Sequence, residues 1–97
     1  MIDYQKFVKN IFPEAIVFRD IKTSANLNFI VLQKPLPNLI YDQKQDYYYS
    51  ESHWSVVLKW QDINDSNFLS NWYLTKRSAW KNAHQCIMHK LRKSLEE

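Results

Sequence analysis

Cysteine and histidine are the residue types most typical of nucleophiles, metal ligands and general bases, and this 97-residue chain has one cysteine, Cys86, and three histidines, His53, His84 and His89. His84 and His89 are five residues apart, which places their rings on different sides of a helix rather than around one metal ion. Cys86 and His89 are one helical turn apart, but two ligands do not make a structural zinc site. We therefore expect no catalytic residue, no metal ion and no cofactor, and a protein that is not an enzyme.

Glycine is absent from the chain, although it makes up about 7% of an average protein. A phosphate-binding P-loop, a dinucleotide fingerprint and a serine nucleophile elbow all need glycine where the backbone turns tightly or approaches a ligand. The composition thus excludes these classes of enzyme. Asp62 and Asp65 are better explained by turn formation than by acid–base catalysis.

Positive charge is concentrated near the end of the chain. Residues 76–93 include six cations and no carboxylate, within a net charge of +3 for the whole protein. A helix that begins near Thr75 would present free N–H groups beside the first two of these cations, an arrangement that suits a phosphate. The candidate phosphate contacts are Lys76, Arg77, Lys81, Arg92 and Lys93.

The elements that must position these residues follow from the sequence pattern. Asp3 caps a short first helix that ends near Phe12, before Pro13. Alternating or β-branched residues predict strands at 15–21, 27–32, 54–60 and 68–74, with Trp54 and Trp60 in the core. Residues 33–52 read as a long connection with little regular structure. The order α-β-β-β-β-α predicts an α+β fold with an antiparallel sheet of about four strands and a long C-terminal helix packed on one face.

A hydroxyl residue, Thr75 or Ser78, caps the C-terminal helix. Its buried stripe is predicted to be Ala79, Trp80, Ala83, Ile87 and Leu91. We expect residues 1–97 to form a single globular domain. The lone cysteine and the lack of an export signal or a long apolar run predict a cytoplasmic protein with no membrane contact.

Two groups of residues are candidates for a surface that binds a partner. The run Tyr47, Tyr48, Tyr49 lies in the predicted loop, where three adjacent tyrosines cannot all be buried. The outward face of the last helix carries Lys81, His89 and Arg92. The alternatives are that the tyrosines cover a sheet edge and that the helix face is simply solvated.

The chain resembles small accessory proteins encoded by phages and prophages. The likeness rests on Phe7, on residues 12–15 (Phe-Pro-Glu-Ala), on the first hairpin, on Leu69-Ser70 and Thr75, and on residues 79–83 (Ala-Trp-Lys-Asn-Ala). It implies an accessory role in the cytoplasm of a bacterial host cell, such as inhibition of host defence, as in the anti-CRISPR proteins. Residues 33–60 are unmatched, and no functional residue carries over.

The start of the last helix is also similar to that of double-stranded RNA-binding domains, through Thr75, Lys76, Arg77, Ser78 and Ala79. That likeness implies phosphate contacts at the helix start. The sequence therefore predicts a non-enzymatic phage-type inhibitor that blocks a host protein or nucleoprotein by occupying its functional surface. A nucleic-acid-binding module is the alternative, and an antitoxin or immunity protein would act by the same mechanism as the inhibitor.

Overall fold

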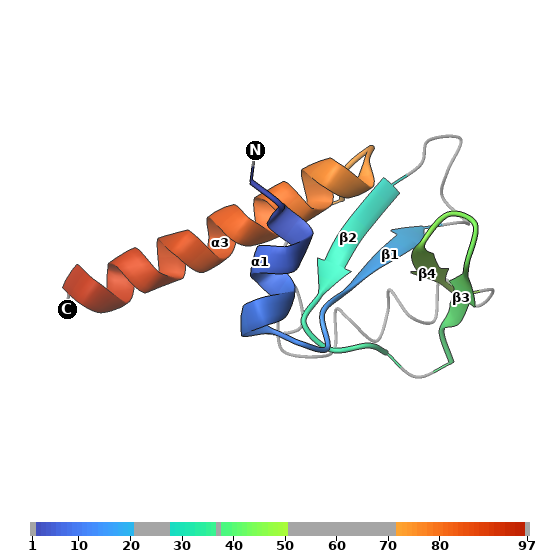
Figure 1. The fold of residues 1–97 in the computed structure, drawn as a ribbon, viewed down its shortest axis with the longest axis horizontal. Helices are drawn as coiled ribbons and strands as arrows, with labels where there is room; N and C mark the ends of the chain where they lie inside the picture. Colours follow the sequence, from blue (N-terminus) through green and yellow to red (C-terminus); the bar gives the residue numbers. More distant parts are fainter. Residues whose placement is uncertain (1, 21–27, 37, 51–71, 97) are drawn as a thin grey trace.

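Among the described residues, two helices, one near each end of the chain, flank four strands in the sequence. The computed structural model describes residues 2–20, 28–36, 38–50 and 72–96. The α+β class and the order α-β-β-β-β-α are confirmed (Figure 1). The elements are α1 (Tyr4–Ile11), β1 (Ile16–Asp20), β2 (Asn28–Leu32), β3 (Ile40–Asp42), β4 (Tyr47–Tyr49) and α3 (Lys76–Glu96).

The first helix begins and ends where its caps predict. The Asp3 carboxylate accepts a hydrogen bond of 3.1 Å from the backbone N–H of Lys6, which satisfies one of the free donors of the first turn. At the other end the N–H of Phe12 donates to the carbonyl of Val8 at 2.7 Å. Val8 is fully buried and anchors α1 on the rest of the molecule.

The first hairpin is confirmed, and it forms one half of the sheet. β1 and β2 pair antiparallel, from Ile16 opposite Leu32 to Asp20 opposite Asn28. The described strands are ordered β2-β1-β4-β3 in one sheet. β4 runs parallel to β1, so the sheet is mixed and mostly antiparallel rather than fully antiparallel as predicted.

The second half of the sheet lies where the sequence predicted a connection without regular structure. That prediction is wrong, because β3 and β4 form a hairpin within residues 33–52. Asp42 Oδ1 accepts from the backbone N–H groups of Lys44 and Gln45 at 3.0 and 3.3 Å, and Asp46 closes the turn at φ 56°. Asparagine and aspartate tolerate this left-handed conformation better than other non-glycine residues, so the turn forms without glycine.

The two later predicted strands fall largely outside the described residues. This holds for the whole of 54–60, with Trp54 and Trp60, and for 68–71 of the strand predicted at 68–74. Within the described end of that segment, Tyr73 forms an antiparallel bridge with Phe29 through backbone hydrogen bonds of 2.6 and 2.7 Å.

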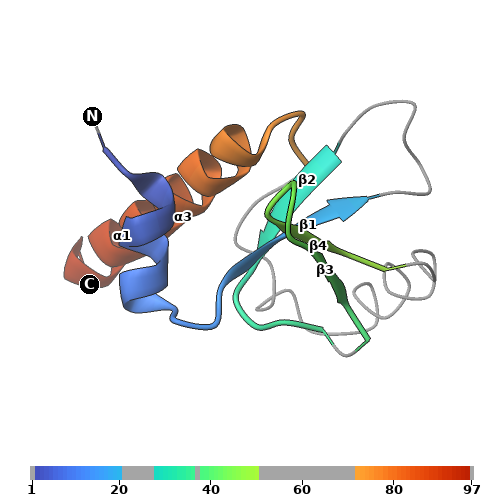
Figure 2. The ribbon, with the colours of Figure 1, turned by 45° about the vertical axis from the view of Figure 1, so that its right-hand side comes forward.

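Both faces of the β1–β2 hairpin are buried. Val17, Phe29 and Val31 face the two helices, and Tyr47 lies in the same cluster. The alternate residues form a second cluster on the opposite face of the sheet: Ile16, Phe18, Ile30 and Leu32, with Leu36, Leu39 and Tyr48 packed against them. Figure 2 shows α1 and α3 together on one side of the strands.

The long C-terminal helix begins at its predicted cap and extends beyond the body of the molecule. Thr75 Oγ1 accepts from the N–H of Ser78 at 3.1 Å. The predicted stripe is buried as far as Ile87, including Trp80 at 4% exposure, but Leu91 is 50% exposed. The helix ends away from the sheet (Figure 1). No described helix is long and apolar enough to span a membrane.

Candidate functional site

The tyrosine run is a strand, and its first member belongs to the core. Tyr47 is 5% exposed and packs edge-on against Phe29, with ring centroids 5.8 Å apart. Its hydroxyl accepts a 2.7 Å hydrogen bond from Arg19 Nη1, and the same guanidinium lies 5.4 Å from the ring centroid. The predicted loop position is therefore wrong, and Tyr47 offers no surface to a partner in this fold.

The other two tyrosines are half-buried and lie on opposite faces of the sheet. Tyr48 packs on the second cluster, on the face of the sheet opposite the helices, with its ring 5.0 Å from that of Tyr41 on the neighbouring strand. Tyr49 packs on the helix side, 6.2 Å from Tyr47. This is the sheet-covering alternative, and it follows from the strand period of two, which sends successive side chains to opposite faces.

The polar face of α3 points outward. Lys81, His89 and Arg92 are all exposed. The C-terminal half of α3, which carries His89 and Arg92, and the β3–β4 hairpin lie at opposite ends of the molecule (Figure 1). The structure therefore divides the predicted contact surface into two separate places.

The five candidate phosphate contacts divide in a similar way. The Lys76 ammonium donates to the carbonyl of Gln45 in the β3–β4 turn. The Arg77 guanidinium lies 5.3 Å from the centroid of the Tyr4 ring, against α1. Lys76 is half-buried and Arg77 is exposed, and the other three candidates are exposed farther along α3: Lys81, Arg92 and Lys93.

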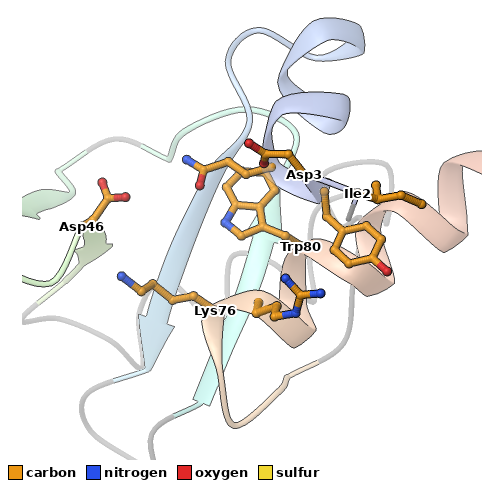
Figure 3. Close-up of a pocket in the computed structure, with 8 residues that line it drawn as sticks. Ile2, Asp3, Asp46, Lys76 and Trp80 are labelled. Carbon is orange, nitrogen blue, oxygen red and sulfur yellow. The ribbon is translucent and has the colours of Figure 1, made fainter.

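A cleft at the start of α3 is the feature that sequence reasoning missed. Its volume is about 410 Å³, and it lies where the starts of α1 and α3 meet the β3–β4 turn (Figure 3). Its lining residues are Ile2, Asp3, Tyr4, Gln5, Asp46, Lys76, Arg77 and Trp80. The caps at Asp3 and Thr75 marked the two helix starts in the sequence, but nothing local indicated that they adjoin.

One carboxylate of the cleft is tied to the tyrosine of the neighbouring strand. Tyr41 donates a 2.7 Å hydrogen bond to Asp46 Oδ1. Because this bond is made by the protonated phenol, it raises the pKa of Tyr41 above its usual 10.0, and the negative charge of Asp46 adds to the effect. Asp46 thus enters the cleft as an oriented carboxylate.

A second hollow, of about 250 Å³, lies farther along α3, and most of its lining is apolar. It is bounded by Ile11, Phe12, Gln33, Cys86, Ile87, Lys90 and Leu91. The cysteine and the two histidines of α3 do not converge here. His84 turns toward α1, where its ring lies 4.6 Å from that of Phe7, and Cys86 Sγ is 3.7 Å from Asn82 Oδ1. The described residues contain no group of three or more His, Cys, Asp or Glu that could hold a metal ion.

Comparison with known proteins found no relatives. A scan against models of protein families, a search of curated proteins and a search of solved structures each returned no match.

Proposed function

We propose that this protein acts by binding a protein partner and covering that partner's functional surface, without catalysis. The observation that carries the proposal is the exposure of leucines among cations at the end of α3. Leu91 is 50% exposed and Leu95 is 87% exposed. Lys90, Arg92 and Lys93 are exposed beside them.

Leu91 and Leu95 continue the apolar stripe of α3 beyond Ile87, the last buried residue of that stripe. Ile87, Leu91 and Leu95 follow one another at intervals of four residues, so they share one face of α3. Ile87 is buried, and the apolar hollow beside it also reaches Ile11, which is 43% exposed. Burying an exposed leucine stabilises an interface by about 1.5–3 kcal/mol. This continuous apolar strip fits a helix-in-groove contact, in which side chains at helical spacing provide the anchors.

The charges around this strip favour a protein partner over a nucleic acid. A nucleic-acid backbone would use the cations but leave the leucines without apolar contact. A protein surface with an apolar centre and an acidic rim would satisfy both. Lys76 and Arg77, the cations at the helix start, lie against the Gln45 carbonyl and the Tyr4 ring, at the opposite end of α3 from the exposed leucines.

The class of inhibitor is supported by the sequence. The resemblance to phage accessory proteins suggests a host defence protein or nucleoprotein as the target, and a small protein that blocks by occupancy needs no catalytic residue. The first test is functional: expression in a bacterium whose CRISPR system targets a phage should restore plaque formation by that phage. Plaque counts that stay at the level of the empty vector across CRISPR types would remove the anti-CRISPR assignment.

The binding surface is tested with a double variant, Leu91→Ser with Leu95→Ser, and with Gln85→Ser as the matched control on the outward face of the same helix. We expect the wild type and the Q85S control to capture the same protein from bacterial lysate, and the double variant to lose it while its circular dichroism is unchanged. Titration with duplex RNA and duplex DNA at two salt concentrations runs in parallel. Tight duplex binding that falls steeply with salt and ignores the leucine substitutions would replace this proposal with the nucleic-acid alternative.

A further inference from the structure

The cleft at the start of α3 combines features of a small-molecule site that the proposed function does not use. Three segments distant in sequence meet there: the start of α1, the β3–β4 turn and the first turns of α3. Its volume of about 410 Å³ falls within the range of about 300–1,000 Å³ that is typical of ligand pockets. Trp80 and Tyr4 supply aromatic surface, and Ile2 adds an aliphatic side chain at the rim.

Trp80 provides a hydrogen-bond donor that the protein leaves unused. Its side chain is 4% exposed. In Figure 3 the indole nitrogen is directed into the cleft, toward the space between Lys76 and Asp46. Within the part of the chain that the structure describes, this N–H makes no hydrogen bond, and it is not among the buried unpaired atoms, so it is open to an acceptor in the cleft. An acceptor atom of a ligand would complete it.

Lys76 places a cation beside that donor. Its ammonium has three N–H groups, and the bond to the Gln45 carbonyl engages it from one side. The first turn of α3 contains no acidic residue, so its free N–H groups and partial positive charge reinforce the preference for an anionic group. Together, Trp80 and Lys76 suit a carboxylate.

The opposite charge is also present in the lining. Asp46 accepts from Tyr41 through one oxygen, and Asp3 accepts from the Lys6 N–H through one oxygen. A carboxylate has about four lone-pair sites, so both groups can accept further hydrogen bonds. The two carboxylates equal in number the two cations of the lining, Lys76 and Arg77. A ligand with only negative charge would be repelled by the carboxylates, and a simple cation by the basic side chains.

We propose that this cleft binds a free amino acid or a similar small zwitterion. The ligand carboxylate accepts from the indole N–H of Trp80 and from the Lys76 ammonium. The ligand ammonium donates to Asp46, and an aliphatic side chain packs on Tyr4 and Ile2. The site lies at the opposite end of α3 from the exposed leucines, so the inference does not depend on the proposed function.

The test follows the indole N–H directly by two-dimensional ¹H–¹⁵N NMR of the full chain, with the Trp80 resonance assigned from its loss in Trp80→Phe. The probes are L-leucine, sodium acetate, ethylamine and inorganic phosphate, at equal pH and ionic strength. We expect L-leucine to shift the Trp80 resonance in a saturable way, and the three singly functional probes to shift it much less at the same concentration.

Two variants test whether the cleft recognises both the carboxylate and the ammonium group of the ligand. Asp46→Asn removes the negative charge but keeps an acceptor oxygen for Tyr41, and asparagine tolerates the left-handed backbone at this position. Lys76→Gln removes the positive charge. Each variant should weaken L-leucine binding by about tenfold or more, as expected for the loss of a charged hydrogen bond. Lys81→Gln, on the exposed face of α3, is the matched control and should bind as the wild type does. An unmoved Trp80 resonance at saturating L-leucine would overturn the proposal. Equal shifts with acetate or phosphate that ignore Asp46→Asn would also overturn it, in favour of a plain anion site.

Discussion

Replacement of Tyr47 by phenylalanine tests whether the Tyr47 hydroxyl stabilises the fold. The change keeps the ring, and with it the edge-on contact to Phe29 at 5.8 Å and the stacking of Arg19 at 5.4 Å. It removes only the hydroxyl that accepts the 2.7 Å hydrogen bond from Arg19 Nη1. Arg19 Nε is already buried with no hydrogen-bond partner among the described residues. The variant would therefore leave a second guanidinium nitrogen unpaired.

The expected loss of stability follows from this geometry. A hydrogen bond to a charged group contributes about 1.5–3 kcal/mol to the free energy of unfolding. Arg19 is only half-buried, so its freed N–H group can regain some water, and we expect the lower part of that range, about 1.5–2 kcal/mol. Tyr48→Phe is the matched control, because the Tyr48 hydroxyl makes no hydrogen bond within the described residues. Its effect should stay within about 0.5 kcal/mol.

The assay is equilibrium unfolding in urea, followed by circular dichroism, with the slope of the transition compared between the variants. A lower midpoint at an unchanged slope reports a change in stability. Equal midpoints for Tyr47→Phe and Tyr48→Phe would refute the reasoning, since they would show that the buried hydroxyl contributes no more than the half-buried one.

Three further predictions concern the helix cap, the core and the Tyr41–Asp46 pair. Thr75→Ala removes the acceptor for the Ser78 N–H and should lower the free energy of unfolding by about 1 kcal/mol in urea, with Thr75→Ser largely restoring it. Leu32→Ala, at a fully buried position, should cost about 2–5 kcal/mol in the same assay, and a loss below about 1 kcal/mol would contradict its burial. Asp46→Asn should lower the pKa of Tyr41, measured by ultraviolet titration of the phenol against wild type and Tyr41→Phe. Because the folded state holds this proton more tightly than the unfolded state, stability from this pair is present below pH 10 and is lost as the pH rises through the folded-state pKa of Tyr41. An unchanged titration in Asp46→Asn, which keeps an acceptor oxygen, would show that the negative charge of Asp46 does not contribute to the raised pKa.

Local patterns were sufficient for the helices and for the first hairpin. The caps at Asp3 and Thr75 are hydrogen bonds that span three residues, so the residues that make them are close in the sequence. The β1–β2 hairpin is likewise a pairing between neighbouring segments. The outward position of Lys81, His89 and Arg92 follows from helical spacing alone.

The tyrosine strand could not be predicted in the same way. β3 and β4 each contain three residues, too few for the alternation that reveals a strand. β4 forms because it lies parallel beside β1, with Tyr48 opposite Phe18, and because Arg19 pairs with the Tyr47 hydroxyl. These contacts join distant parts of the chain, so the three tyrosines taken alone predict a solvent-exposed loop.

The sequence by itself determined the class of fold, both ends of the first helix, the start of the last helix and the basic, carboxylate-free run at residues 76–93, because these depend on residue type and short-range spacing. Only the tertiary structure decided that Tyr47 is a core residue, that the apolar stripe of α3 becomes exposed at Leu91, and that Asp46, Lys76 and Trp80 line one cleft. The physical reason is the same in each case. Burial and the meeting of charges depend on which distant segments pack together, and no local pattern in the chain specifies that packing.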